Sequence, residues 1–172
     1  HDTIAHHDIR MWPEPGQVTY LVFEGECGLG TRSGGYDTVD MATNEVLRSW
    51  RICEHVTPDP VFEDWAHLNT IEPFPDERAL LVSARNQATL YKVDYDTGEV
   101  EWALGTHGDF AMAPEDLFEH QHAPMFTDTG TIVLFDNGKP GGREESRLIE
   151  IAYDEDTMTA EVVWEWRADP PL

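Results

Sequence analysis

The sequence predicts an all-β fold, and three observations support that prediction. Short apolar runs recur along the chain, and Gly-, Pro- or Asx-containing turns bound each of them, which is typical of β-strands. Helical periodicity is weak, and the best helix candidate is a single turn at residues 114–118, where Pro114 suits a first helical position. Strands, histidines and tryptophans also recur at a period of roughly 50–60 residues, which indicates repeated structural units.

Most of the apolar runs fall into two sets: three single strands, and three pairs of strands that each follow one of them. The first set is predicted at residues 18–23, 79–84 and 131–135. Downstream of each lies a pair joined by a polar turn: residues 36–40 with 46–50, 90–94 with 100–102, and 148–151 with 162–164. Asx and Gly residues stand where the hairpin turns of these pairs require them.

A histidine-bearing segment opens each unit. The separation from His7 to His67 is 60 residues and that from His67 to His122 is 55. Four short antiparallel strands at such a period are the pattern of a β-propeller blade. The sequence thus predicts one partial β-propeller domain, residues 1–172, with blade-like units at about 1–60, 61–115 and 116–172.

Three blades are about half of a six-bladed ring, and propellers typically have four to eight blades. We therefore expect the ring to be completed by sequence missing from this chain, by another subunit of a homo-oligomer, or not at all. The first strand of a blade lies innermost, so residues at equivalent positions of successive blades converge near the axis. His6 and His7 alternate faces, and of the two we expect His7 to point into the channel.

The charge balance limits the classes of partner. The chain has 34 acidic and 11 basic residues and a formal net charge of −23, which argues against nucleic-acid binding because that needs basic patches. No apolar run reaches the length of a membrane span. A strongly acidic surface suits a halophilic or marine source, because salt screens its self-repulsion, and predicts stability that rises with added salt.

Two cysteines, Cys27 and Cys53, are too few for a multi-cysteine zinc site. They are compatible with one disulfide in an oxidising compartment or with two buried thiols. The chain starts at His1 without a signal-peptide pattern, so either a removed signal or an excerpt from a longer chain fits.

His67, Asn69 and Arg85 stand at the ends of two adjacent predicted strands, where a hairpin would bring them together. An imidazole, an amide and a planar guanidinium fork together favour a tetrahedral oxyanion. Trp65 is a candidate wall for an aromatic substrate, although packing within a blade is the commoner role of tryptophan here.

Several short polar segments, in their order along the chain, resemble the bacterial aryl-sulfate sulfotransferases, the nucleotide-independent arylsulfotransferase family of β-propellers. The matching segments are His6-His7-Asp8-Ile9, Asp64-Trp65-Ala66-His67-Leu68-Asn69, Ser83-Ala84-Arg85-Asn86-Gln87, Gln121-His122 and Leu134-Phe135-Asp136-Asn137-Gly138. Each segment alone is a weak signal, and their combination is a strong one. The resemblance covers most of the chain.

The resemblance implies transfer of a sulfuryl group from a phenolic sulfate ester to a phenolic acceptor through a sulfohistidine, without a metal or other cofactor. It implies His122 as the nucleophile, with His120 as a competing candidate. His67, Asn69 and Arg85 match sulfate-binding residues, and His7 matches a further active-site histidine. Either His7 or His67 would protonate the leaving phenolate. A periplasmic or extracellular location follows from the same resemblance.

Two other functions stay open at the level of sequence. His7, His67 and His122 supply the three imidazoles that a catalytic zinc requires, which would make the protein a metal-dependent hydrolase. A non-catalytic propeller segment that serves as a binding surface is the other alternative. Arg85 favours the transferase over the metal site, because a guanidinium at the convergence point opposes a cation and attracts an oxyanion.

Overall fold

The structure of the chain is a computed structural model, and it describes residues 4–26, 32–58, 64–139 and 142–169. These residues form twelve strands and two short 3-10 turns. Their bounds are β1 Ile4–Arg10, β2 Gln17–Glu26, β3 Arg32–Asp40, β4 Val46–Arg51, η1 Ile52–Glu54, β5 Leu68–Pro73, β6 Ala79–Ala84, η2 Arg85–Gln87, β7 Thr89–Asp94, β8 Val100–Gly105, β9 His122–Phe126, β10 Ile132–Asp136, β11 Arg147–Asp154 and β12 Thr159–Arg167.

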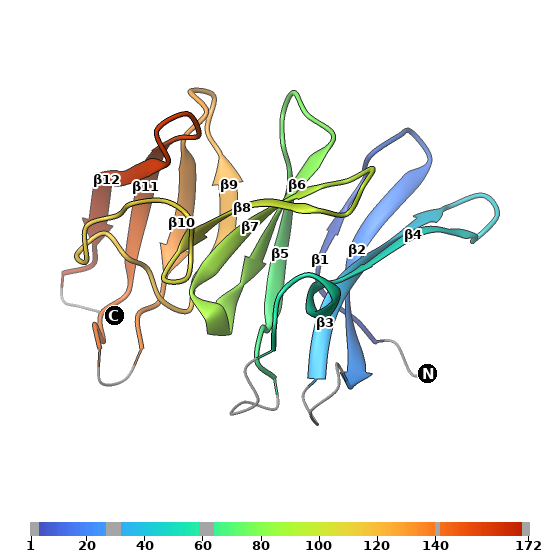
Figure 1. Cartoon of the computed structure of the whole chain (residues 1–172), viewed down its shortest axis with the longest axis horizontal. Helices are drawn as coiled ribbons and strands as arrows, with labels where there is room; N and C mark the ends of the chain where they lie inside the picture. The colour runs from blue at the N-terminus through green and yellow to red at the C-terminus, as the bar shows by residue number, and fades with distance from the viewer. Residues whose placement is uncertain (1–3, 27–31, 59–63, 140–141, 170–172) are drawn as a thin grey trace.

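The strands form three four-stranded antiparallel sheets, each following the chain in simple up-and-down order: β1 to β4, β5 to β8, and β9 to β12. Figure 1 shows the three sheets side by side in chain order, from the N-terminal sheet in blue to the C-terminal sheet in red. The first strands adjoin, since β1 lies against β5 and β5 against β9. The predicted all-β fold of about three propeller-like blades is therefore confirmed.

The last hairpin of each sheet is built in the same way. Asp40, Asp94 and Asp154 each end a strand and accept a hydrogen bond from the backbone N–H of the residue three positions on, which is a threonine in every case. These backbone hydrogen bonds lower the pKa of all three carboxyl groups. This repeated Asp-x-x-Thr turn is a second structural period of the chain, independent of the histidines.

Two apolar layers hold the three sheets together. One packs Leu21, Tyr36 and Trp50 of the first sheet against the second sheet, and the other packs Trp102 and Leu104 of the second sheet against the third. Tryptophans complete both layers: the indole N–H of Trp50 donates to the Gly98 carbonyl of the neighbouring sheet at 2.9 Å. Burial of this apolar area is the main stabilising term between blades.

The far face of the third sheet differs from these packed faces. Trp102 and Trp164 hold equivalent positions, because each pairs with the residue just before a register shift between the last two strands of its sheet. Trp102 is 4% exposed beneath the third sheet, whereas Trp164 is 46% exposed and Trp166 is 48% exposed. The described residues place no further sheet over these two indoles.

One sequence-based element is wrong. Residues 114–118, predicted as a helical turn, form a hydrogen-bonded turn in which Asp116 N–H donates to the Ala113 carbonyl at 3.0 Å. Cys53 is disulfide-bonded, and Cys27, the other cysteine of the sequence, lies outside the described residues. Within the described part of the chain no helix is long and apolar enough to span a bilayer.

Candidate functional site

The histidines stand at or near irregular pairing of the inner strands: His7 lies within β1, His67 just before β5, and His122 at the start of β9. The register of β1 on β2 shifts between Ala5 and Ile9, and that of β5 on β6 shifts between Leu68 and Thr70. The third inner strand, β9, has a shift opposite Val133 and Phe135. Bulges of this kind re-aim side chains at the rim of a sheet.

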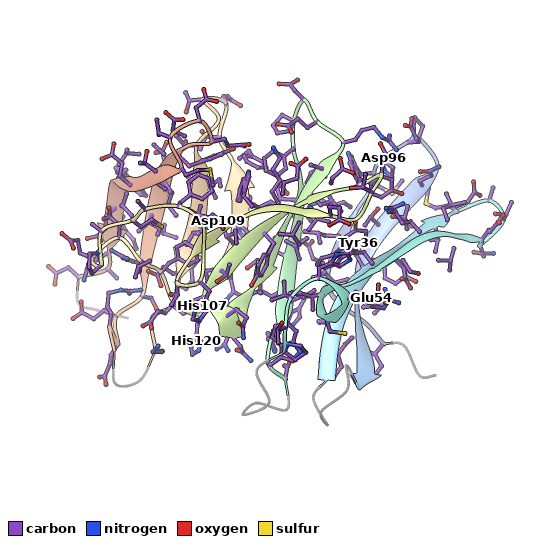
Figure 2. The ribbon with its side chains drawn as sticks, in the orientation of Figure 1. Tyr36, Glu54, Asp96, His107, Asp109 and His120 are labelled. Atoms are coloured by element: carbon purple, nitrogen blue, oxygen red, sulfur yellow. The ribbon has the colours of Figure 1, made fainter. Side chains whose placement is uncertain are left out.

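The backbone at these bulges is left-handed at residues that are not glycine. The φ angles are 58° at His7, 48° at His67, 51° at His120 and 50° at Ala123. A non-glycine residue in this region carries a conformational cost, and such residues concentrate at functional sites. In Figure 2 His120 lies at the lower edge of the molecule, far from the hairpin turn that carries Asp96.

Arg85 is held beside His67 by a short clamp. The 3-10 turn η2 is tied to the segment before β5 through its backbone, since Arg85 N–H donates to the His67 carbonyl at 3.1 Å. The Asn86 and Gln87 side-chain amides donate to the carbonyls of Asp64 (2.6 Å) and Trp65 (2.8 Å). The side chains of Asn86 and Gln87 therefore fix the turn, and the side chain of Arg85 extends from it.

The guanidinium of Arg85 is half-buried and has no carboxylate partner among the described residues. Its recorded hydrogen bond runs from Nη1 to Asn86 Oδ1 at 2.7 Å. The other donors of its planar fork are therefore available for an anion.

His67 forms a dyad with Asp64. Its Nδ1 lies 2.5 Å from Asp64 Oδ2, and its backbone N–H donates to Asp64 Oδ1 at 3.2 Å. Burial opposes ionisation of Asp64, but the hydrogen bond and the charge of His67 outweigh it and lower the pKa of the carboxyl. The carboxylate accepts from Nδ1–H and leaves Nε2 facing away from it, an arrangement typical of an oriented acid–base histidine.

His7 and His122 complete the cluster around His67 and Arg85. The rings of His7 and His67 have centroids 5.2 Å apart, in edge-to-face contact. Burial, followed by the charges of His67 and His122, lowers the pKa of His7. Burial, followed by the charges of Arg85 and His67, lowers the pKa of His122 against a raising hydrogen bond to the His120 carbonyl. Both rings therefore favour the neutral form near pH 7.

His122 is fixed by the loop that follows β10. Its Nδ1 lies 3.0 Å from the His120 carbonyl oxygen and 2.8 Å from Asn137 Nδ2. Asp136, fully buried, accepts from the backbone N–H groups of Glu119 (2.9 Å) and Gly138 (3.1 Å) and from Arg147 Nε (2.9 Å). The Asp136-Asn137-Gly138 segment thus binds the residues just before β9 to the end of β10.

Asn69 and Gln121 join the second and third sheets behind the cluster. Asn69 is buried and its Nδ2 donates to the Gln121 carbonyl at 2.7 Å. The Gln121 amide in turn donates to Ser83 Oγ, at 3.1 Å, and to the carbonyls of Ala84 and Thr89. Asn69 therefore places the backbone next to His122, a contact that the oxyanion interpretation of the sequence did not include.

The two histidine pairs of the sequence differ in their surroundings. His7 has His67, His122 and Arg85 as charged neighbours. The ring of His6 packs on the rings of His7 and Phe23 and carries a hydrogen bond to the Val22 backbone. The charged neighbours of His120 are Arg85, Glu119 and Lys139. His7 and His122 thus each have both Arg85 and His67 as charged neighbours, whereas His6 and His120 each have one of the two.

Trp65 does not line a site. It is 0% exposed and lies in the apolar layer between the first and second sheets, so the prediction that it walls a substrate is wrong. The buried Trp65 side chain anchors the Asp64–His67 segment to the apolar core.

No group of three His, Cys, Asp or Glu side chains within the described residues is arranged to hold a metal ion. His7, His67 and His122 adjoin one another without that geometry. The chemistry of the cluster, imidazoles around a cation, suits an oxyanion.

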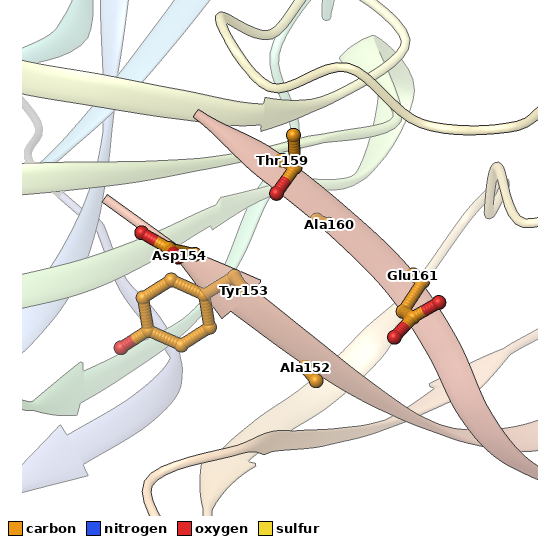
Figure 3. A pocket seen from close by; sticks show the side chains of 6 residues that line it. All are labelled: Ala152, Tyr153, Asp154, Thr159, Ala160 and Glu161. Carbon is orange, nitrogen blue, oxygen red and sulfur yellow. The ribbon is translucent and has the colours of Figure 1, made fainter. Parts of the chain in front are cut away.

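Two surface hollows lie away from the cluster. Figure 3 shows one of about 400 Å³ on the hairpin of β11 and β12, where Tyr153, Asp154 and Glu161 surround it. The other, of about 430 Å³, includes Leu117, Arg143 and Arg167. The two arginines that line the second hollow are already paired with carboxylates, Arg167 with Glu165 and Arg143 with Asp136.

Sequence reasoning assigned no role to Asp64, Asn86, Gln87, Gln121 or Asn137. All five lie within or beside the segments that carried the resemblance. The spacing Asp-x-x-His was the available signal for the dyad. A carboxylate three residues before a histidine can accept hydrogen bonds from the backbone N–H and from the ring Nδ1–H of that histidine.

Comparison with known proteins identifies the family of the chain. The family model described as arylsulfotransferase (ASST) matches residues 5–170. The arylsulfate sulfotransferase AssT of Lelliottia amnigena is 25% identical in an alignment 138 residues long, which covers 60% of this chain and 23% of that protein. This chain therefore spans about a quarter of the length of that relative.

Among solved structures, the β-propeller domain of the trilobed protease from Pyrococcus furiosus, described as having an open velcro topology, aligns with a TM-score of 0.48 and 9% identity. That alignment covers 90% of this chain and 40% of the other. The family match, in contrast, runs almost from end to end of the sequence and confirms the resemblance drawn from its polar segments. The chain belongs to the arylsulfotransferase family.

Proposed function

We propose that the cluster of His7, His67, Arg85 and His122 is a sulfuryl-transfer site that takes an aryl sulfate as donor and a phenol as acceptor. The observation that carries the proposal is an Arg85 guanidinium with no carboxylate partner in the described structure, clamped beside three histidines. Such a group needs an anion, and a sulfate ester matches its fork.

In the first half-reaction Nε2 of neutral His122 attacks the sulfur of the donor. The Nε2–S bond forms as the S–O bond to the aryl group breaks, and the electron pair leaves with the phenolate oxygen. By analogy with phosphoryl transfer, the transition state is loose and places charge on the peripheral oxygens. Arg85 stabilises that charge, which is the main catalytic term of such a site.

His67 protonates the departing phenolate. Of the two candidate acids, His7 and His67, only His67 has a carboxylate partner: Asp64 Oδ2 lies 2.5 Å from its Nδ1 and orients the ring. Burial and neighbouring charges keep His7 neutral, so its role is to donate a neutral N–H toward the sulfuryl oxygens. In the second half-reaction His67 accepts the phenol proton as the acceptor oxygen attacks sulfur and the Nε2–S bond breaks.

We further infer a periplasmic or extracellular location. The disulfide at Cys53 supports it, because disulfides persist in oxidising compartments. A small-molecule donor and acceptor fit a site that lies at the open edge of the three sheets.

The test is incubation of the 172-residue chain with 4-nitrophenyl sulfate, with and without a phenol, followed by peptide mass analysis. We expect acceptor-dependent release of nitrophenol and one added sulfuryl group on the peptide that contains His122. The His122→Gln variant should lose both, while His107→Gln, in an exposed loop, should keep both.

Three outcomes would contradict the proposal. Release without an acceptor indicates a sulfatase, and stoichiometric bound zinc indicates a metal-dependent hydrolase. Aryl sulfate binding that is unchanged in His122→Gln, without turnover in either protein, indicates a binding module.

A further inference from the structure

The side chain of Gln121 lies at the base of the turn that carries Arg85. Gln121 is 0% exposed, and its Nε2 donates to Ser83 Oγ at 3.1 Å. The same nitrogen donates to the carbonyl oxygens of Ala84 and Thr89, both at 3.2 Å. Ala84 and Thr89 pair at the end of the β6–β7 ladder, and η2 lies between them. One amide from the segment before β9 thus spans both ends of this turn.

The acceptors fix the orientation of the Gln121 amide. An amide nitrogen has two hydrogens, so it serves three neighbouring acceptors only if one hydrogen is shared. Turning the amide over would place its own oxygen against the carbonyl oxygens of Ala84 and Thr89, which repel it. The donor contacts are therefore the favourable ones, and a side chain without N–H groups would lose all of them.

The backbone around Gln121 is anchored to β5. The Gln121 carbonyl oxygen accepts from Asn69 Nδ2 at 2.7 Å, and the N–H of Ala123 donates to Thr70 Oγ1 at 3.2 Å. Asn69 and Thr70 are both buried on β5. His122 stands between these two anchors, so its backbone is tied to β5 on both sides and to the η2 turn through Gln121.

Arg85 has a separate support that does not include Gln121. The η2 turn is clamped to residues 64–67 by its backbone and by the amides of Asn86 and Gln87. Burial and then the charge of Arg85 lower the pKa of the His122 ring, so the two groups are close enough to interact. The side chain of Gln121 is a direct link between the turn that presents Arg85 and the strand that presents His122.

Resting on the proposed sulfuryl transfer, we propose that Gln121 is a positioning residue, which sets the spacing between the Arg85 guanidinium and the His122 ring by bonding the turn of the one to the strand of the other. Arg85 holds the peripheral oxygens while a ring nitrogen of His122 bonds to sulfur. The aryl S–O bond breaks, and its electron pair leaves with the phenolate oxygen. These roles need a fixed distance, because a misplacement of about 1 Å can cost on the order of 100-fold in rate.

Kinetics of Gln121→Met test the proposal. Methionine is close to glutamine in length and removes both N–H groups. We expect kcat with 4-nitrophenyl sulfate and a phenol to fall about 100-fold. We expect KM to stay near the wild-type value, because the clamp that presents Arg85 is intact.

Thr38→Val is the matched control. It removes another buried hydrogen bond, which joins the hydroxyl groups of Thr19 and Thr38 at 2.8 Å within the first sheet. This variant should lose stability in urea unfolding and keep its kcat. A loss of rate that follows from lower stability alone would appear in both variants.

Inorganic sulfate gives a readout that needs no turnover. Ring ¹⁵N NMR follows its binding, with His67 and His122 assigned through their glutamine variants. In wild type we expect sulfate to shift both rings and to raise the pKa of His122, since a nearby anion favours the charged ring. In Gln121→Met the dissociation constant followed at His67 should stay within about threefold of wild type. The rise in the pKa of His122 should fall to about half or less, because the ring is no longer held beside the bound anion.

The titratable groups of the cluster and its rim all remain in Gln121→Met. They are His7 on β1, Asp64 and His67 before β5, Arg85 on η2, Glu119 and His120 before β9, and Lys139 after β10. Neither glutamine nor methionine is charged, so a changed response of His122 to sulfate reports its distance from the anion.

Gln121→Glu is the conservative variant, and it carries the same test if Gln121→Met does not fold. Burial favours a protonated carboxyl group, which retains one donor. We therefore expect its kcat and its sulfate response at His122 to lie between those of wild type and Gln121→Met.

Three results would overturn the proposal: an unchanged kcat in both Gln121 variants, an equal loss of kcat in Thr38→Val, or a loss of sulfate binding together with kcat. A wild-type chain that binds no sulfate overturns this proposal and the proposed function alike. A chain that transfers no sulfuryl group but shows the expected sulfate responses contradicts the proposed function and leaves the role of Gln121 standing.

Discussion

A guanidinium surrounded by imidazoles is stable only while those imidazoles are neutral or an anion is present, because like charges at short range repel. The cluster around Arg85 meets the first condition through burial, which lowers the pKa of His7 and of His122. An aryl sulfate would supply the second. At the scale of single residues, the His7 and His122 rings favour the neutral form in the empty site, and an anionic substrate would balance the remaining charge of Arg85.

Arg85→Lys tests the shape of the cation. Lysine keeps the charge but loses the planar fork, so we expect sulfuryl transfer to fall by about 100-fold with little change in folding. Initial rates with the aryl sulfate donor measure the effect, and circular dichroism measures the fold. Arg78→Lys, at an exposed ion pair with Asp96, is the control. Equal rates in Arg85→Lys and wild type would mean that the fork does not contact the sulfuryl group.

The sequence predicted the chemical types of the clustered residues but not all of their partners. Histidines at a 55–60-residue spacing, with one arginine, were recognisable because the repeat brings equivalent positions together. Asn69 was expected to face the anion, yet its amide donates to the Gln121 backbone. That contact crosses between blades, and no local pattern encodes it.

At the scale of elements, the turn after β10 controls the position of the His122 ring. Gly138 has a φ of 69°, and a Cβ placed there would lie 2.0 Å from the Arg143 carbonyl oxygen. Only glycine combines that backbone conformation with that contact. The turn therefore depends on Gly138 both for its conformation and for its fit.

Gly138→Ala should destabilise the chain by more than the left-handed conformation alone requires. Gly130→Ala is the matched control, because its φ is 83° but an added Cβ meets nothing within 4 Å. We expect about 1 kcal/mol for Gly130→Ala and a clearly larger loss for Gly138→Ala. Urea unfolding measures both. Similar values for the two variants would show that the loop relaxes around the added methyl group.

Strands were the most predictable elements, since an apolar run bounded by turn residues can be recognised from local sequence alone. The turn at residues 114–118 was mistaken for helix because Pro114 and the acidic residues after it suit a helix start. Only Asp116 N–H there bonds back to Ala113, after which the chain leaves to pack Phe118 between sheets. The burial of Phe118 thus determined the conformation of this segment, which local propensity did not determine.

At the scale of the whole molecule, the sheets are joined by apolar layers, by hydrogen bonds such as that from Trp50 to Gly98, and by the buried cation Lys92. Lys92, 4% exposed, forms ion pairs with Glu77, Glu101 and Glu155, the last of them on the third sheet. Burial lowers the pKa of its ammonium group, but these carboxylates outweigh that effect and raise it. The blades could be predicted from the sequence, but ion pairs between them such as Lys92–Glu155 could be found only in the structure.

The stability of the chain should fall as pH falls through the range of its histidines. The pKa values of His6, His7, His120 and His122 are lowered from 6.5 by burial, so the unfolded chain binds more protons just below that pH. Their contribution is complete above pH 6.5 and is lost as pH drops through the lowered values. Urea unfolding between about pH 7.5 and 5, in about 0.5 M salt to screen the net charge of −23, measures it.

A His7→Gln, His122→Gln double variant should show a weaker dependence on pH than wild type. His107→Gln, in the exposed loop, should retain the full dependence. Stability that stays constant over this range in wild type would contradict the linkage.

The left-handed backbone at His7, His67 and His120 has a consequence for variation at these positions. Glycine or asparagine adopts that conformation more easily than histidine, so replacement there relieves strain while it removes an imidazole. A library selected only for thermal tolerance would drift toward those residues and lose its chemistry, whereas selection for turnover would restore histidine.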